Sequence, residues 1–372
     1  MSVQHPSPPP PGVESNPDGG SGRAGAGWPA ARILLVAAVV VSTTAFVVLV
    51  GVPTDKTLIC AWVAVALTAM GVGREDWWRP LADWGPLVLF LLAYEHTRGL
   101  AYSLGRPTLW LLPADFDTTI GGGVAPTVWL QERLLPADGA VAWWEVPLSV
   151  VYTSHFWVVI VVAAVLWRRR REDFVRFMQR LLTVFGIALC VFVLMPAAPP
   201  WAAARCSPEQ VADRPVAPAC VHERVAPDQR TILGPIEPQL PGNPDHVQRL
   251  TARGLVALPG SPQIVHTAIG GGIKMANPMA AVPSLHAGVS MLVAVTLWPR
   301  VRRRWRPLVA AYPLVMAFTL VWTADHYVFD IMAGWLLVAI AIALTAGIRN
   351  APWGPVSRRS RSGTGGSHPI PT

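Results

Sequence analysis

The chain has 372 residues, of which 52% are hydrophobic and only 14% are charged. This composition excludes an ordinary soluble protein, because apolar runs of about twenty residues, long enough to cross a bilayer, recur along the chain. The net charge of +8 does not indicate a nucleic-acid partner, since the arginines come in short bursts between the apolar runs. Charge distributed in this way is typical of a membrane topology signal.

The two ends of the chain lack the composition of a folded domain. Residues 1–31 are rich in Pro, Gly and Ser and have almost no aliphatic side chains, which predicts a disordered tail. Residues 349–372 are predicted to form a disordered basic tail. The first apolar run starts only at Ile33, lacks a small-residue cleavage site and is followed by further spans. We therefore predict that it is a retained helix and not a signal peptide.

Eight apolar segments are predicted to cross the membrane as helices, which makes the fold all-α and integral to the membrane. The predicted spans are Ile33 to Val52, Leu58 to Val72, Pro86 to Leu104, Val146 to Trp167, Phe174 to Met195, Val282 to Trp298, Leu308 to Thr323 and Asp330 to Ile348. The second and sixth spans are short for a bilayer about 30 Å thick.

Clusters of arginine set the predicted orientation of these spans. They follow the fourth, sixth and eighth spans, at Arg168 to Arg171, Arg300 to Arg306 and Arg358 to Arg361. Short cytoplasmic loops collect Arg and Lys, and alternating crossings put all of these clusters on one side together with both termini. The sequence therefore predicts a multi-pass protein of the cell membrane with both termini in the cytoplasm.

Two polar runs fall on the opposite, extracytoplasmic side. Ala281 to Gly288 reads AVPSLHAG and Asp325 to Asp330 reads DHYVFD, and each opens onto an apolar span. Ionisable groups at such depth are costly and suggest a function. His326 and Asp330 are four residues apart, so on a helix the carboxylate can hold one imidazole nitrogen and leave the other as a nucleophile. The alternative is that these residues are two core histidines and a helix-end aspartate.

Another histidine, His155, lies in the fourth span. It either lines the cavity that holds His286 and His326 or is a hydrogen-bonded core residue.

These motifs carry a family resemblance. Pro-Ser-Leu-His-Ala-Gly at Pro283 to Gly288, followed about forty residues later by His-Tyr-x-x-Asp-x-x-Ala-Gly at His326 to Gly334, resembles the second and third motifs of the type-2 phosphatidic acid phosphatase superfamily. The closest resemblance is to its inositol phosphotransferase-like branch, related to inositol phosphorylceramide synthase. It implies a six-helix catalytic membrane domain, here residues 81–348, preceded by two additional helices at residues 32–80.

The resemblance also implies the chemistry. His326 would be the nucleophile that becomes a phosphohistidine, Asp330 would orient it, and His286 would be the general acid. No metal or other cofactor is implied. The substrate would be a phospholipid or a polyprenyl phosphate. The bilayer is the only other predicted partner, and the oligomeric state is left open.

Phosphoryl transfer also needs cations and donors around the phosphate oxygens. Ser284 lies within the motif, beside backbone N–H groups at the start of a span. Lys274 and Asn277 precede the same motif, although Lys274 reads equally as a solvated loop charge. Arg98 is the nearest match to the family's first motif, and pairing with Glu95 is its alternative explanation.

The acceptor stays open between an alcohol and water. The superfamily's third-motif arginine is missing, because Thr319 and Leu320 stand in its place, and this favours the synthase-like branch over a plain phosphatase. A phosphatase acting on a lipid phosphate or polyprenyl pyrophosphate remains an alternative. A catalytically inactive relative that binds or moves lipid is the second alternative.

The cysteines and the long outer connections complete the expectations. Cys60 and Cys190 lie within spans and are predicted to be core residues. Cys206 and Cys220 share an outer connection, and the sequence leaves open whether they form a disulfide. The first long connection, residues 105–145, is predicted to be an aromatic-rich cover, and the second, residues 197–281, an extended Pro-rich chain.

Overall fold

The computed structural model describes residues 27–49, 56–73, 76–97, 100–136, 138–223, 230–235, 247–257 and 279–350. Arg98, Lys274 and Asn277, three of the predicted phosphate ligands, lie outside these residues, as does the third arginine cluster. The first helix begins at Gly27, so it extends into the stretch predicted to be an N-terminal tail.

Each of the eight predicted spans corresponds to a helix. These helices are α1 (Gly27–Leu49), α2 (Lys56–Gly71), α3 (Arg79–Thr97), α7 (Glu145–Arg169), α8 (Arg171–Leu194), α12 (Leu285–Leu297), α13 (Arg306–Trp322) and α14 (Val328–Asn350). Among the described residues, four segments are long and apolar enough to cross a membrane: Glu145–Arg169, Arg171–Leu194, Arg303–Trp322 and Val328–Ala346. Shorter apolar helical stretches occur at Ala30–Phe46, Ala61–Gly71 and Leu285–Leu297. The protein is an all-α membrane protein, as predicted.

The predicted bounds of helix α3 were wrong. Its start was expected at Pro86, but the helix begins at Arg79 and carries Pro86 in its interior. Pro80 lies in the first turn, where a residue without an N–H costs nothing, so the helix can start there. The helix ends at Thr97, and the short helix α4 (Leu100–Ser103) occupies the rest of the predicted span.

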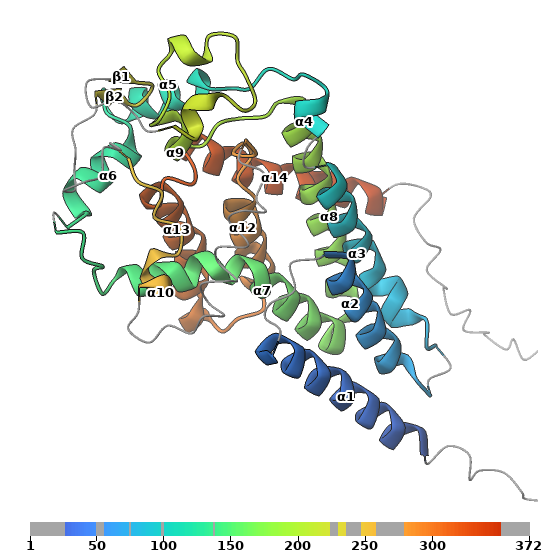
Figure 1. Cartoon of the computed structure of the whole chain (residues 1–372). Helices are drawn as coiled ribbons and strands as arrows, with labels where there is room; N and C mark the ends of the chain where they lie inside the picture. The colour runs from blue at the N-terminus through green and yellow to red at the C-terminus, as the bar shows by residue number, and fades with distance from the viewer. Residues whose placement is uncertain are drawn as a thin grey trace, which may run out of the picture.

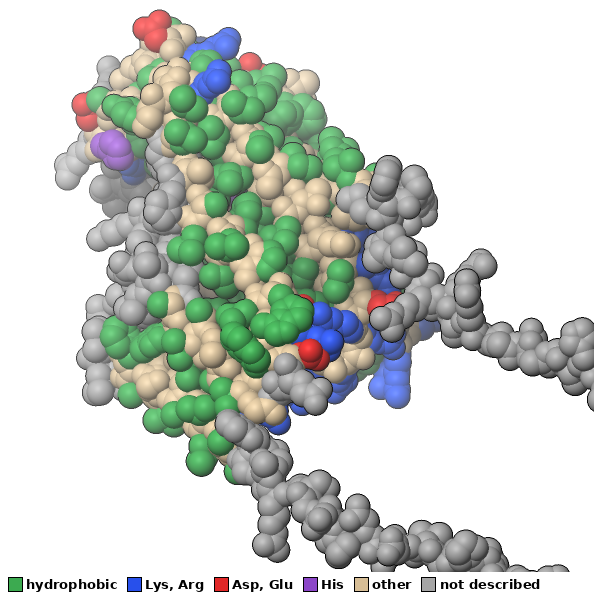
Figure 2. Space-filling model, turned by 90° about the vertical axis from the view of Figure 1, so that its right-hand side faces the viewer, with side chains coloured by type: hydrophobic (Ala, Val, Ile, Leu, Met, Phe, Trp, Pro, Cys, Tyr) green, Lys and Arg blue, Asp and Glu red, His purple; other side chains and the backbone are tan. Residues whose placement is uncertain are grey.

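The bundle core lies between α2, α3, α7, α8, α12 and α14. Helix α8 contributes one continuous apolar stripe, with members three or four residues apart and at most 1% exposed: Phe174, Phe177, Leu181, Val184 and Ala188. The opposite surface of the helices is also apolar. Phe156 and Leu336 are 61% and 60% exposed, and Figure 2 shows hydrophobic side chains over most of one face. A surface of this kind fits contact with lipid.

Ionic contacts join the helices at the end of the bundle that carries the described arginine clusters, which we call the arginine end. Arg300, after α12, lies 2.6 Å from Asp173 in the first turn of α8. Asp83 of α3 accepts a hydrogen bond from the indole N–H of Trp167 at 2.7 Å and pairs with Arg171. The two described arginine clusters therefore lie at the same end of the bundle.

The described parts of the two outer connections form a compact cap at the other end. The cap contains α5 (Leu111–Ile120), α6 (Pro126–Leu134), α9 (Pro200–Ala203), α10 (Arg253–Val256), the 3-10 turns η1 (Glu209–Val211) and η2 (Ala219–Val221), and an antiparallel pair of β1 (Arg230–Thr231) with β2 (Gly234–Pro235). A third 3-10 turn, η3 (Arg303–Trp305), precedes α13. Figure 1 shows α5, α6, α9 and the β1–β2 pair together on one side of the molecule, with α1 on the opposite side.

The structure corrects one prediction about the connections and one about a cysteine. Cys206 and Cys220 form a disulfide that is buried together with Trp110, so the described part of the second connection is folded and not extended. The indole N–H of Trp110 donates to the carbonyl of Pro215 at 2.9 Å, which ties the first connection to the second. Cys190 is an exposed free cysteine on α8 and not a core residue.

Candidate functional site

The two motif helices, α12 and α14, touch backbone to backbone. A Cβ atom added to Gly334 would lie 2.4 Å from the carbonyl oxygen of Ser284, and one added to Gly288 would lie 3.2 Å from the carbonyl oxygen of Gly334. The backbone N–H of Ser284 donates to the carbonyl of Asp330 at 3.0 Å. The glycines therefore permit a close approach that puts the start of α12 beside the start of α14.

His326 and Asp330 are in contact, as their spacing predicts. The Nδ1 atom of His326 lies 3.2 Å from Oδ2 of Asp330, and the same oxygen accepts the backbone N–H of Tyr327 at 2.9 Å. Asp330 is fully buried and His326 is 8% exposed. His326 precedes the first residue of α14, so the contact crosses the helix start and does not run along a helix face. Nε2 of His326 is left for chemistry.

His286 stands in the first turn of α12, within an aromatic group contributed by α7. Its ring stacks on His155 with centroids 4.0 Å apart and on Tyr152 with centroids 4.7 Å apart. The ring of His326 is 6.1 Å away, centroid to centroid. Among the described residues, Nε2 of His286 has no hydrogen-bond partner. His155 therefore lies against the histidine pair, as one of its two sequence interpretations expects.

The turn between α13 and α14 fixes the backbone of His326. The N–H groups of Asp325 and His326 both donate to the carbonyl of Leu320, at 3.1 and 3.2 Å. Ala324 has a φ of +59°, the left-handed conformation that usually falls to glycine or asparagine at a helix end. Its carbonyl accepts the N–H of Trp201 at 3.1 Å. The cap therefore holds this turn from outside.

An arginine that the sequence did not single out lies beside the turn that carries His326. Arg249, in the second outer connection, lies with its Nε 3.1 Å from Oδ1 of Asp325, the residue before His326. The hydroxyl of Thr251 lies 2.8 Å from each oxygen of the same carboxylate. The guanidinium stands 4.8 Å from the ring centroid of Trp201 and its side chain is 28% exposed. Asp325 thus fixes a cation next to the histidine pair.

A comparison with protein families agrees with this geometry. A family model described as the PAP2 superfamily matches residues 123–344, more than half of the chain, and the match contains both histidine motifs. The chain belongs to the PAP2 superfamily. Neither a curated protein nor a solved structure matches it. PAP2 proteins are generally phosphatases or phosphotransferases, and the family acts on phosphate-containing lipids.

Gln131 of α6 sets the position of Arg249 in this PAP2 protein. Its side-chain NH2 donates to the carbonyls of Gln248 and Trp322, both at 2.8 Å, and its oxygen accepts the N–H of Gln248 at 2.9 Å. Gln131 is fully buried. It therefore joins the residue before Arg249 to the end of α13. This role could not be predicted from the sequence, because the partners are more than a hundred residues away.

Asp117 of α5 caps the first turn of α14 from a distant part of the chain. Its Oδ2 accepts the N–H of Val328 at 2.9 Å and its Oδ1 accepts the N–H of Phe329 at 3.1 Å. These donors are orphan groups of a helix start, where a carboxylate is favoured. Burial nevertheless raises the pKa of Asp117 from 3.8 to about 6, because desolvation outweighs the two hydrogen bonds.

The remaining candidates fall in different places. Ser284 is the N-cap of α12 and its hydroxyl oxygen accepts the N–H of Ala287 at 3.3 Å. Two residues stand where the family's third motif carries an arginine. Leu320 is fully buried, and the hydroxyl of Thr319 donates to the carbonyl of Val315 at 2.7 Å. In the part of the chain that the structure describes, no group of three or more His, Cys, Asp or Glu is arranged to hold a metal ion.

Proposed function

We propose that this protein transfers a phosphoryl group from a lipid-linked phosphate at the extracytoplasmic face of the cell membrane, through a phosphohistidine at His326. The observation that carries the proposal is the meeting of α12 and α14 at Gly288 and Gly334, with the rings of His286 and His326 6.1 Å apart. Attack on phosphorus begins from about 3–3.5 Å and a hydrogen bond to oxygen spans about 2.8 Å. Two rings this close together can both contact a single phosphate group.

The chemistry follows from the hydrogen bonds of each ring. Asp330 accepts from Nδ1–H of His326, so Nε2 carries the lone pair that attacks phosphorus. The P–N bond forms as the P–O bond to the lipid breaks, and His286 gives its proton to the departing oxygen. In the second step His286 takes a proton from the acceptor, whose oxygen bonds to phosphorus while the P–N bond breaks. Asp330 stabilises the positive charge of the His326 ring in both steps.

Arg249 takes the role of the missing third-motif arginine in this proposal. It stands against Asp325, directly before the nucleophile, and its guanidinium is partly exposed on the cap side. An arginine fork suits the equatorial oxygens of a phosphoryl group, where negative charge gathers during transfer. Ser284, Lys274, Asn277 and Arg98 are the further proposed phosphate ligands.

An alcohol is the acceptor that we favour, which would make the protein a phosphotransferase of the inositol phosphotransferase-like branch. The absence of an arginine at Thr319 and Leu320 supports this choice, because the phosphatase pattern carries one there. Water as acceptor would give a lipid phosphate or polyprenyl pyrophosphate phosphatase. Supplying inositol to the purified protein with a labelled phospholipid separates the two, since only the first activity yields a phosphorylated alcohol.

The extracytoplasmic orientation has its own support and its own test. The arginine clusters gather at the end remote from the cap, and the cap contains the Cys206–Cys220 disulfide, which suits an oxidising compartment. In a background without Cys60 and Cys190, a cysteine at Asp213 should react with a membrane-impermeant thiol reagent in intact cells. A cysteine at Arg303 should be shielded. Labelling of Arg303→Cys from outside would invert the orientation.

The histidine roles are tested with a nitrophenyl phosphate ester and rapid quenching. His326→Ala should give no burst of nitrophenolate, because no covalent phosphoenzyme can form. Nitrophenolate is stable near neutral pH and needs little protonation on leaving, so His286→Ala should still give a burst. That variant should then stall as phosphohistidine, which is acid-labile and base-stable and can be mapped by mass spectrometry. A burst in His326→Ala with none in His286→Ala would exchange the roles, and a label on neither histidine would refute the covalent mechanism.

A further inference from the structure

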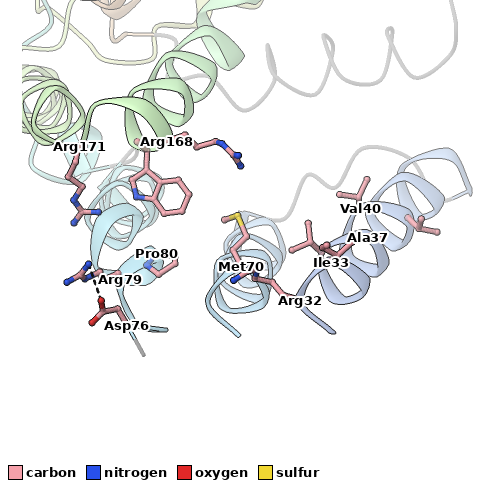
Figure 3. A pocket seen from close by; sticks show the side chains of 13 residues that line it. Arg32, Ile33, Ala37, Val40, Met70, Asp76, Arg79, Pro80, Arg168 and Arg171 are labelled. Atoms are coloured by element: carbon pink, nitrogen blue, oxygen red, sulfur yellow. Dashed lines mark ion pairs between the residues drawn. The ribbon is translucent and has the colours of Figure 1, made fainter. Parts of the chain in front are cut away.

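A second site candidate lies at the arginine end, between the two N-terminal helices and the rest of the bundle. A cleft of about 1160 Å³ opens there, with walls from α1, α2, the start of α3 and the end of α7 (Figure 3). Helix α1 packs on α2, for example through Phe46 against Trp62 at 4.9 Å. The cleft separates α1 from α7. His155 is almost four helical turns from Arg168 along α7, roughly 20 Å at 1.5 Å per residue, so the cleft is distinct from the histidine site.

The charges that line the cleft are unbalanced. Four arginines line it: Arg32, Arg79, Arg168 and Arg171. Asp76, the acidic residue in the wall, pairs with Arg79 at 3.0 Å, and Asp83 behind the wall pairs with Arg171. Among the described residues, Arg32 and Arg168 have no carboxylate partner. Figure 3 shows these two arginines reaching toward the space from helices on opposite sides of it.

An apolar wall continues from Arg32 along α1. Val36, Ala37 and Val40 follow at helical spacing and line the same cleft, and Met70 of α2 closes the space beside them. From Arg32 to Val40 the helix rises about 12 Å. This wall leads away from the arginines along the apolar side of α1. A free phosphate ion would use the charged mouth and leave the apolar wall bare, whereas a lipid would cover both.

We propose that the cleft binds one anionic phospholipid of the leaflet at the arginine end, with its phosphate between Arg32 and Arg168 and an acyl chain along α1. Basic pockets between membrane helices are a known setting for anionic head groups. The bound lipid fills the gap between α1 and α7 and joins α1 to the bundle. The proposal does not depend on the activity assigned to the histidines.

The test measures lipid retention by the purified full-length protein in native mass spectrometry. Equal amounts of phosphatidylglycerol and phosphatidylcholine are added in detergent, and the lipid-bound fraction is followed with concentration. Wild-type protein should retain one phosphatidylglycerol selectively. Arg32→Gln with Arg168→Gln should raise its apparent dissociation constant roughly fivefold for each arginine, about 25-fold for the pair. The matched control, Arg169→Gln with Arg303→Gln, removes the same charge at the same end outside the cleft and should leave retention unchanged.

A third variant tests the apolar wall separately. Ala37→Trp fills the cleft and leaves all four arginines in place, so it should also lose the retained lipid. Thermal unfolding in lipid-free detergent verifies that each variant is folded. Equal retention of the two lipids by the wild type, or an equal loss in the control pair, would refute a specific site. Wild-type retention in Ala37→Trp would refute the acyl chain's place in the cleft, and displacement by millimolar inorganic phosphate alone would identify a simple anion site.

Discussion

Replacing Gly334 by alanine should separate the two motif helices and misplace the histidine pair. The new Cβ would lie 2.4 Å from the carbonyl oxygen of Ser284, whereas real contacts of this kind lie beyond 3.0 to 3.4 Å. The backbones must therefore move apart by about 0.6 to 1 Å. Misplacement of reacting groups by 1 Å can cost about 10²-fold in rate, and overpacking costs about 1–3 kcal/mol of stability. We expect Gly334→Ala to show both losses.

The assay compares the nitrophenolate burst and the thermal unfolding midpoint with those of two other glycine variants. Gly186→Ala, within α8, places its Cβ in open space, so it should keep full activity and equal or raise the midpoint. In Gly288→Ala the new Cβ would lie 3.2 Å from the carbonyl oxygen of Gly334, so its burst rate and unfolding midpoint should fall between those of the other two variants. If Gly334→Ala has the burst rate of Gly186→Ala, close backbone contact is not what positions the histidines, and the reasoning fails.

Further predictions concern the groups around the histidine pair. Asp330→Asn should keep the contact to the N–H of Tyr327 but lose about 10²- to 10⁴-fold in turnover, since the amide cannot stabilise the charged His326 ring; near-full turnover would make Asp330 structural. Arg249→Gln should lower kcat by about 10²- to 10³-fold. Thr251→Val also removes a hydrogen bond to Asp325, but it should lower kcat much less. Equal losses of kcat would mean that Arg249 only holds Asp325 in place. The pKa of Asp117 in the folded protein is about 6, above its ordinary 3.8. Its protonated form therefore adds up to about 3 kcal/mol to the free energy of unfolding below about pH 4. This contribution is lost as the pH rises through 6. Asp117→Asn should remove that part of the pH dependence of the unfolding midpoint, and an unchanged slope between pH 4 and 6.5 would show that another group causes it.

The spans were predictable because each is an apolar run of nearly membrane length, and that signal is local to the sequence. The predicted bounds of α3 are wrong at Pro86. Pro86 lies inside α3, which begins at Arg79 because Pro80 already satisfies the first turn. Cys190 was misassigned for a related reason: in a membrane helix both faces are apolar, so composition does not tell the core side from the lipid side.

The contact of His326 with Asp330 was also predicted from their four-residue spacing, although His326 precedes α14 and the contact crosses the helix start. The contact between α12 and α14 was harder to predict, although both glycines that permit it, Gly288 and Gly334, belong to the two sequence motifs. The supporting groups Asp117, Gln131 and Arg249 gave no signal. Each acts on a partner far along the chain, and an isolated Asp, Gln or Arg in a connection reads as an ordinary polar loop residue.

These supporting groups share a pattern that ties the cap to the chemistry. Asp117 caps the start of α14, Gln131 holds the end of α13, and Arg249 binds the residue between them, so three cap side chains converge on the turn that carries His326. The bundle alone brings the two histidines together through the glycine contact. The cap holds the backbone of the turn that carries His326 and places Arg249 beside it, whereas Asp330 of α14 contacts the His326 ring. We therefore expect changes in the cap to alter phosphate binding and rate even when the membrane helices are intact.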